Sequence, residues 1–366
     1  MDKALRPGSP DRLPPHTDAG IIGWLRTRLF SSPLNAVLTI LALWLLLMAI
    51  PALIDYLFVK PDFSATTAAQ CRETGGYCWA FVREKHRLIL FGIYPYAEQW
   101  RPLLASVILV AVVICSCIRW FWKPFLGVLW LLALAAFGVL MWGGVFGLTY
   151  VENSRWGGLP VTLILSTFGI ALAFPFGLLL ALGRRSDMPG VKAVCVVYIE
   201  LIRGVPLVSL LFMSSVMLPL FLPEGFSIDK LLRAQIAIIL FAAAYVAETV
   251  RGGLQAMPKG QYEGAQSIGL SYWQSMRKII LPQALKIVIP PLVGIFISLF
   301  KDTSLVVIIG IFDLTQAAKV AVSDAVWRGF STEAYLFISV IYFIFCFSIS
   351  RYSLSLERQL DQGQKR

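Results

Sequence analysis

The uncharged stretch "GGLPVTLILSTFGIALAFPFGLLLALG", residues 157–183, decides the fold class of this chain. A hydrocarbon core about 30 Å thick needs about 20 consecutive apolar residues in a spanning helix, and this stretch exceeds that length. The 366-residue chain is 58% hydrophobic and 14% charged, whereas soluble domains carry about 25% charged residues. The sequence therefore predicts an all-α, polytopic membrane helical bundle, because a large water-soluble core would need charged surface that the chain lacks.

Working outward, seven further segments are apolar enough to be spanning candidates, which makes about eight transmembrane helices in all. The predicted spans are residues 35–58, 103–118, 125–147, 159–183, 205–222, 234–250, 287–312 and 335–350. With an even number of spans, both termini lie on the same side of the membrane. From residue 148 onward, the loops on that side carry more Lys and Arg than the opposite loops, so we expect both termini in the cytoplasm.

The net charge of +11 is explained by these basic loops at a membrane surface, and we expect no nucleic acid partner. Residues 1–34 are polar and rich in Pro, and they lack the short apolar core of a cleavable signal. We expect them to form a cytoplasmic tail that is retained. The lipid bilayer itself is the first predicted partner.

Small residues become frequent within the spans from about residue 151, and small residues let membrane helices approach closely. We therefore predict a five-helix core at 151–366 and a three-helix N-terminal extension at 35–150, with an external loop at 59–101. Cys71 and Cys78 share the polar sequence "CRETGGYCW" in that loop. If the loop lies outside the cytosol, a disulfide is expected; two free thiols are the alternative.

Two short patterns echo each other in the core, "YIELIRG" and "YVAETVRGG". Glu200 precedes Arg203 by three positions, and Glu248 precedes Arg251 by three, so each acid shares a helix face with its base. One interpretation is a self-neutralised pair near the membrane surface. The other places Glu200, Arg203 and Glu248 on the path of a solute.

Lys301 and Asp302 interrupt the seventh predicted span. Charges within a membrane usually face a cavity or a partner. Either the two residues mark a helix break that neighbouring helices stabilise, or one of them lines a path for the carboxylate or ammonium group of an amino acid.

A polar stretch, "EGAQSIGLSYWQSMRKIILPQ" at 263–283, separates the last long apolar segments and lies within a predicted helical hairpin at 253–285. Gly269 suits a left-handed helix end. Ser271 and Gln274 fit a capping box that starts a second helix. We expect Trp273, Met276 and Ile280 on one face of that helix, and Pro282 to end it and begin the next one.

This hairpin resembles the cytoplasmic "EAA" loop of ATP-binding-cassette importer permeases. The family pattern is Glu-Ala-Ala, then Gly, then Ile, then Leu-Pro at fixed spacing. Here the matching positions are Glu263, Gly264, Ala265, Gly269, Ile279, Leu281 and Pro282. Gly264 replaces the usual Ala, which keeps the side chain small and costs up to about 1 kcal/mol of helix stability.

The flanks "YIELIRGVPL" and "LFKDTSLVVIIG" resemble polar amino acid permeases, and the long N-terminal part is similar to the larger subunits of general L-amino acid permeases. The resemblance implies a type I importer core in a bacterial inner membrane, carrying polar or broad-range L-amino acids. It implies two ATPase subunits that bind ATP and Mg²⁺, a second and usually different permease subunit, and a periplasmic amino-acid-binding protein. It also implies that Glu263, Gly264, Ala265, Gly269, Leu281 and Pro282 couple this chain to the ATPase.

Enzymatic chemistry is not expected in this chain. It has no G-x-x-x-x-G-K-[ST] phosphate loop, so ATP hydrolysis requires a separate subunit. His16 and His86 lie far apart in sequence and predict no metal site. Two other functions remain open at this point, an ion-coupled secondary amino acid transporter and an assembly subunit that carries no solute. Which amino acids are carried, and what the 59–101 loop does, are not encoded in any recognisable pattern.

Overall fold

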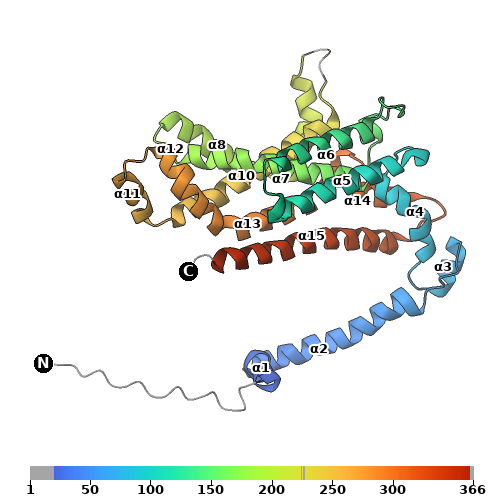
Figure 1. Ribbon diagram of the computed structural model, residues 1–366. Helices are drawn as coiled ribbons and strands as arrows, with labels where there is room; N and C mark the ends of the chain where they lie inside the picture. Colours follow the sequence, from blue (N-terminus) through green and yellow to red (C-terminus); the bar gives the residue numbers. More distant parts are fainter. Residues whose placement is uncertain (1–19, 224, 226, 363–366) are drawn as a thin grey trace. The chain divides into compact units, whose positions relative to one another are not determined.

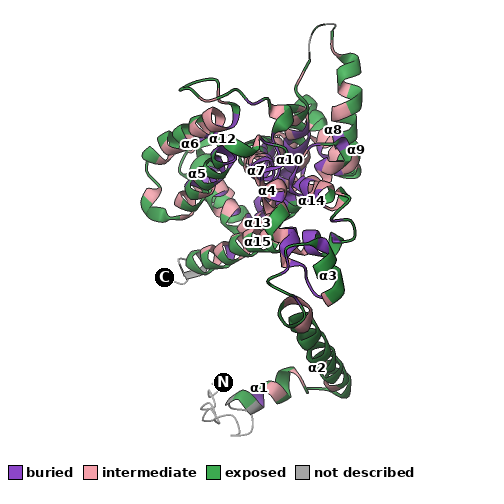
Figure 2. Ribbon diagram, turned by 90° about the vertical axis from the view of Figure 1, so that its right-hand side faces the viewer, coloured by how far each residue is buried: buried purple, intermediate pink, exposed green. Residues whose placement is uncertain are grey.

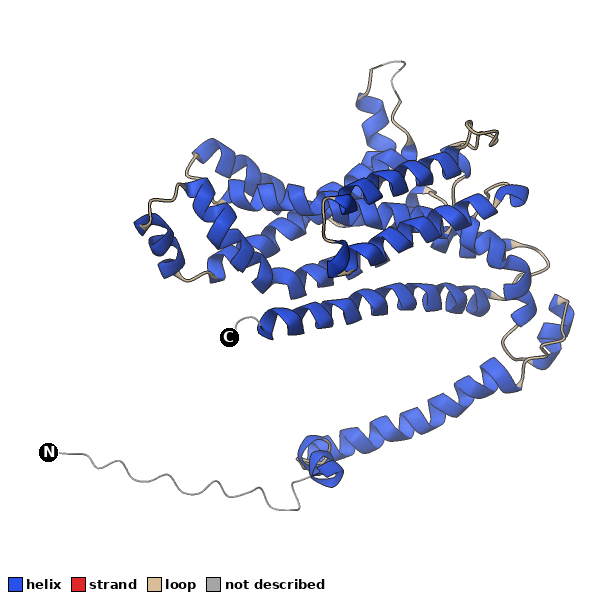
Figure 3. Ribbon diagram, viewed as in Figure 1, coloured by secondary structure: helices blue, strands red, loops and turns tan. Residues whose placement is uncertain are grey.

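The structure, a computed structural model, describes residues 20–223, 225 and 227–362. These residues are helical, and among them the only β-type pairing is an isolated bridge between Gly158 and Asp313 (Figure 3). This agrees with the predicted all-α class. The chain divides into two compact units, Met1–Ala80 and Phe81–Arg366, which are described separately. The first nineteen residues of the predicted tail lie outside the described residues, and the predicted division near residue 150 remains a prediction.

The first unit contains one long apolar helix and a small disulfide-linked loop. Its helices are α1 (Gly20–Arg28), α2 (Pro33–Ile54) with a π-helical continuation (Asp55–Val59), and α3 (Ala68–Thr74). Helix α2 begins at a Ser32 cap that accepts a hydrogen bond from the Asn35 amide, with Pro33 in the first turn, where no amide donor is required. Cys71 and Cys78 are joined by a disulfide, with Cα atoms 5.4 Å apart, and both are buried.

The second unit is a bundle of helices. It holds most of α4 (Trp79–Phe91), then α5 (Trp100–Cys117), α6 (Phe125–Trp142), α7 (Leu159–Arg184), α8 (Pro189–Gly204), α9 (Leu207–Phe212), α10 (Lys230–Ala256), α11 (Lys259–Ser267), α12 (Tyr272–Ser275), α13 (Leu281–Asp302), α14 (Leu314–Ser323) and α15 (Ser331–Gln362). Figure 1 shows α11 and α12 at one end of this unit and α4 and α14 at the opposite end. Short π and 3₁₀ turns link several helices: Tyr96–Glu98, Arg119–Phe121, Asn153–Arg155, Met213–Met217, Leu218–Phe221, Met276–Ile280 and Thr303–Ile309.

Seven helical stretches among the described residues are long and apolar enough to span a membrane, and the number rises to eight if one bent pair is a single span. The helical segment within the predicted span at 205–222 is too short to count as a span by itself. Residues Leu207–Phe221 pass the test only together with α8, from which they bend by 103°. The bend falls at Val205, where Pro206 removes an amide donor and disfavours helical geometry in the residue before it.

Two other predicted boundaries shift for local reasons. The span predicted at 125–147 ends at Trp142, because Gly143 and Gly144 take positive φ angles of 70° and 76°. The α-helical part of the seventh span ends at Asp302, as the charged pair predicts, and continues as a 3₁₀ helix to Ile309.

Small residues determine how closely the central helices pack. A Cβ added at Gly177 of α7 would lie 2.6 Å from the Cβ of Val246 on α10, and one at Gly169 would lie 3.1 Å from both Ile238 and Leu299. Buried residues gather along α7, α10 and α14 (Figure 2). The predicted close packing of small residues in the core is therefore present between α7 and α10.

The helices that precede α7 within this unit are held by polar contacts near their ends. Arg101 of α5 is fully buried, and it donates hydrogen bonds to the carbonyls of Leu140 (2.7 Å) and Thr149 (2.9 Å), which fixes α5 to the end of α6. Lys85 of α4 lies 2.7 Å from the carboxylate of Asp324, in the segment between α14 and α15.

Three glycines allow two backbone segments to cross at the α4 and α14 end of the bundle. We call Gly92, Gly157 and Gly158 the glycine crossing. An added Cβ at Gly92 would lie 2.7 Å from the Cα of Gly157, and one at Gly158 would overlap the carbonyl of Leu90. The amide of Gly158 donates to the Phe312 carbonyl at 2.8 Å. The start of α7 therefore packs closely against the end of α4 and is hydrogen-bonded to the segment before α14.

Candidate functional site

The predicted hairpin turn forms at Gly269. This residue takes a φ of +75°, in the left-handed region, and no heavy atom lies within 4 Å of an added Cβ. The Gly269 amide donates to the Gln266 carbonyl at 2.9 Å, and the Leu270 amide donates to the Ala265 carbonyl at 3.2 Å. These bonds satisfy carbonyls at the end of α11 and turn the chain toward α12.

The predicted capping box is also present at the start of α12. Ser271 Oγ accepts from the Gln274 amide at 3.4 Å, and Gln274 Oε1 accepts from the Ser271 amide at 3.0 Å. Pro282 lies at the start of the next helix, as predicted, but it does not interrupt the helical path. A π-helical turn, Met276–Ile280, passes directly into α13, whose first turn contains the proline. Since a first turn needs no amide donor, the proline is tolerated there, and Tyr272–Ile309 forms one continuous helical stretch.

Burial divides the hairpin into an inner and an outer face. Ala265, Met276 and Ile280 are buried, whereas Trp273 is 67% exposed, so the predicted common face of Trp273, Met276 and Ile280 does not form. Of the other predicted coupling residues, Glu263, Gly264, Gly269 and Pro282 are exposed, and Leu281 is half-buried.

Sequence reasoning missed two exposed apolar residues that adjoin Gly269. Ile268 is 70% exposed and Tyr272 is 50% exposed, and the Tyr272 ring contacts that of Trp273 edge-on, with centroids 5.4 Å apart. We define the docking face as Glu263, Gly264, Ile268, Gly269, Tyr272 and Trp273. The sequence did contain a signal for this exposed surface, because the large apolar residues Ile268, Tyr272 and Trp273 flank the turn glycine in an otherwise polar stretch.

Hydrogen bonds connect α11 to three other helices. Arg185, which follows α7, donates from one guanidinium nitrogen to the Tyr262 hydroxyl and to the Leu254 carbonyl of α10, both at 3.0 Å. The Tyr262 hydroxyl itself donates to the Leu254 carbonyl at 3.1 Å. On the other side, Gln283 of α13 donates to Gln261 at 3.0 Å. A displacement of α11 would therefore act on the ends of α7, α10 and α13.

An ion cluster joins α7, α8 and α10 near the same end of the bundle. We define it as Arg184, Glu200, Arg203, Glu248 and Arg251. Glu248 lies 3.4 Å from Arg184 and 3.8 Å from Arg203, and it also pairs with Arg251. Glu200 pairs with Arg184 at 2.8 Å. The predicted Glu248–Arg251 pair forms, whereas Glu200 and Arg203 take partners on other helices.

The five residues considered for a solute path therefore fall into two groups. Glu200, Arg203 and Glu248 come together in the ion cluster. Lys301 and Asp302 lie at the end of α13, with Lys301 exposed and Asp302 half-buried, and no hydrogen bond or ion pair connects them to the cluster among the described residues. Within those residues, no group of three or more His, Cys, Asp or Glu side chains is arranged to hold a metal ion.

Asp313 is a buried acid that sequence reasoning missed. Its side chain is fully buried and caps α14 by accepting from the amides of Thr315 (3.0 Å) and Gln316 (2.8 Å). Burial raises the pKa of Asp313 to about 6, although these hydrogen bonds oppose the shift. The sequence signal was an Asp placed before a helical pattern, which is typical of an N-cap but does not reveal burial.

Comparison with known proteins places these features in context. A family model described as binding-protein-dependent transport system inner membrane component matches residues 173–362. The chain is 50% identical to the inner membrane amino-acid ABC transporter permease protein YhdY of Escherichia coli, over 97% of both chains. It is 37% identical to the glutamate/glutamine/aspartate/asparagine transport system permease protein BztC of Rhodobacter capsulatus, over 96% of both chains. A solved amino acid ABC transporter with histidines is 35% identical, with a TM-score of 0.49, covering 54% of this chain and 90% of that one.

Proposed function

Because the chain belongs to the family of binding-protein-dependent transport system inner membrane components, we propose that its α11–α12 hairpin is the docking site for a separate ATPase. The chain is a multi-pass inner membrane permease subunit of an amino-acid ABC transporter, and its relatives are permeases rather than enzymes.

The observation that carries the proposal is the combination of an exposed docking face with an inner face that is tied to the bundle. A monomeric hairpin with no partner gains nothing by exposing Ile268 and Trp273 to water. The same hairpin is connected to α7, α10 and α13 through Arg185, Tyr262 and Gln283. It therefore has both a surface for a partner and a mechanical connection to the spanning helices.

The proposed mechanism starts with closure of a dimer of ATPase subunits, which bind ATP and Mg²⁺. Closure displaces α11, with Glu263 making a charged contact to the ATPase. Gln283 transmits the displacement to α13, and the hydrogen bonds of Tyr262 transmit it to α7 and α10. Movement of these helices switches a cavity between two permease subunits from inward-facing to outward-facing, and a periplasmic binding protein delivers the solute.

The proposed orientation places the hairpin end and both termini in the cytoplasm, following the distribution of basic residues. The proposed substrates are polar or broad-range L-amino acids, in keeping with the amino-acid transport named for YhdY and the acidic and amide amino acids named for BztC. Lys301 or Asp302, at the end of α13, is the proposed contact for a charged group of the substrate. The partner permease is proposed to be a related, different chain.

The decisive experiment substitutes Gly269 by Arg. Because the space around Gly269 is open, the Arg side chain would project into the docking face, and we expect loss of both ATPase co-purification and ATP-driven amino acid uptake. Gly269→Ala carries the same backbone strain without the bulk, and it should retain both activities. Gly190→Arg, at an exposed glycine of α8 that also has open space, controls for the added charge. If Gly269→Arg binds the ATPase and supports uptake normally, the hairpin is not the docking site.

A further inference from the structure

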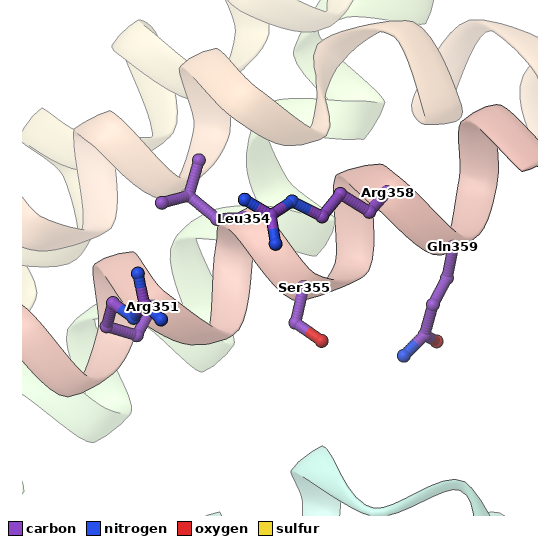
Figure 4. Close-up of a pocket in the computed structure, with 5 residues that line it drawn as sticks. All are labelled: Arg351, Leu354, Ser355, Arg358 and Gln359. Carbon is purple, nitrogen blue, oxygen red and sulfur yellow. The ribbon is translucent and has the colours of Figure 1, made fainter. Parts of the chain in front are cut away.

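A groove lies along the C-terminal part of α15, and none of its lining residues belongs to the docking face. It has a volume of about 260 Å³ and is lined by Arg351, Leu354, Ser355, Arg358 and Gln359. Their spacing places all five on one side of the helix. In Figure 4 the Arg358 side chain extends back along the helix toward Leu354, while Ser355 and Gln359 point to one side of it. We call this feature the headgroup groove.

The positive charge of the headgroup groove is not neutralised within the described part of the chain. Arg351 and Arg358 are exposed, and neither forms an ion pair with a described acidic residue. The acidic residue beside them on α15, Glu357, instead accepts a hydrogen bond from Ser353 at 2.9 Å. Neither guanidinium group therefore donates to a carboxylate of the described residues, and such forks match the oxygens of a phosphate.

The depth of the groove matches the polar boundary of a membrane. Helix α15 begins at Ser331, and a rise of 1.5 Å per residue places Arg351 about 30 Å further along, which is the thickness of a hydrocarbon core. The same level is marked by Trp120 and Trp122, both exposed just after α5, whose Cys117 thiol lies beside the Tyr352 hydroxyl of α15. Exposed tryptophans are typical of the membrane interface.

We propose that the headgroup groove binds the phosphate of an anionic phospholipid. Arg351 and Arg358 donate to the phosphate oxygens, Ser355 and Gln359 contact the polar headgroup, and Leu354 contacts the first part of an acyl chain. The lipid is favoured over a soluble anion because the groove combines charge with an exposed leucine at the depth of the headgroups. This inference is independent of the proposed docking of the ATPase and of the solute that is carried.

The test measures lipid binding to the purified permease complex in detergent by native mass spectrometry. Phosphatidylglycerol, phosphatidylcholine and inorganic phosphate are the probes. The variant Arg351→Gln with Arg358→Gln keeps a polar side chain at both positions but removes both charges. Each basic residue near the membrane surface contributes about 1 kcal/mol to the binding of an anionic lipid, so the loss of two should weaken phosphatidylglycerol binding about 30-fold. The matched control, Arg155→Gln with Lys319→Gln, removes two exposed charges near the opposite end of the unit and should bind like the wild type.

The proposal expects phosphatidylglycerol to bind more tightly than phosphatidylcholine, and inorganic phosphate not to displace it. Arg351→Lys with Arg358→Lys should show a smaller loss, because charge remains while the fork is removed. If the double Gln variant cannot be isolated, each single Gln variant should weaken binding about fivefold. Unchanged phosphatidylglycerol binding in the Gln variants would overturn the proposal, and so would displacement of the lipid by inorganic phosphate. If the Gln variants lose a partner subunit but still bind the lipid, the groove is not a lipid site.

Discussion

Gly158 and Gly269 lie at opposite ends of the helical bundle, and both take positive φ angles, +67° and +75°. Their surroundings differ completely. A Cβ at Gly158 would overlap the Leu90 carbonyl, whereas a Cβ at Gly269 would meet no atom within 4 Å. The same local backbone requirement therefore serves close packing at the glycine crossing and an accessible turn at the hairpin.

The difference extends to the residues around each glycine. At the glycine crossing, the Gly158 amide donates to the Phe312 carbonyl, and Thr162 accepts from the Leu314 amide in a fully buried position. At the hairpin, side chains such as Tyr262 and Gln283 make the connections, and the apolar docking face stays exposed. One end is fixed by its own packing, and the other is held by hydrogen bonds that side chains make.

The sharpest test of this contrast substitutes each glycine by Ala. Gly158→Ala should destabilise the protein by at least about 3 kcal/mol, because a side chain is disfavoured at its backbone angles and also overlaps the chain. Gly269→Ala should cost only about 1 kcal/mol, from the left-handed conformation alone. Thermal unfolding of both variants in detergent measures the difference, and equal midpoints would remove the basis of the comparison.

The buried carboxyl of Asp313 provides a second test at the crossing end. Since burial raises the pKa of Asp313 from about 3.8 to about 6, the folded state binds this proton more tightly than the unfolded state. Its favourable contribution is therefore complete below pH 4 and is lost as the pH rises through about 6, a change of up to about 3 kcal/mol. Asp313→Asn keeps the helix cap and should remove this loss.

The measurement is the unfolding midpoint at pH 4 and at pH 7. The wild type should lose more stability between these values than Asp313→Asn does. If the two proteins show the same pH dependence, ionisation of Asp313 costs no stability, and water reaches this carboxyl group more freely than its burial indicates.

The ion cluster provides a stability test near the hairpin end of the bundle. Glu248 contacts three arginines with its side chain 24% exposed, whereas Glu200 contacts one and is 55% exposed. We expect Glu248→Gln to cost about 2 kcal/mol, because three partly buried arginines lose their shared partner. Glu200→Gln should cost about 0.5 kcal/mol or less. Unfolding midpoints at low and high salt give both values, and a larger effect at Glu200 would contradict the central role of Glu248.

A smaller effect than that of Glu248→Gln is expected at the connection between α11 and the bundle. Tyr262→Phe removes the hydroxyl that bonds Arg185 and Leu254, at a cost of about 1 kcal/mol. If the hairpin transmits motion, the amino acid carried per ATP hydrolysed should fall while ATPase co-purification persists. Tyr150→Phe, at an exposed tyrosine, is the matched control. An unchanged transport ratio in Tyr262→Phe would assign the transmission to other contacts, such as Gln283.

What could be predicted from the sequence rests on interactions between residues that are near one another along the chain. The apolar run at 157–183 is long enough to require a membrane helix. The turn at Gly269 and the capping box of Ser271 and Gln274 depend on only a few consecutive residues, and both form as predicted. The membrane-spanning fold class and the helical hairpin could therefore be predicted without knowledge of how the helices pack.

The tertiary structure decided which residues become partners and which become surface. Glu200 pairs with Arg184 rather than with Arg203, because α7 and α8 bring these side chains together. Trp273 faces outward while Ile280 is buried, and the segment predicted as a span at 205–222 forms a bent pair with α8. Periodicity and charge spacing describe one helix at a time. These outcomes depend instead on how closely the helices approach one another, and buried small residues such as Gly177 determine that distance through contacts with distant segments.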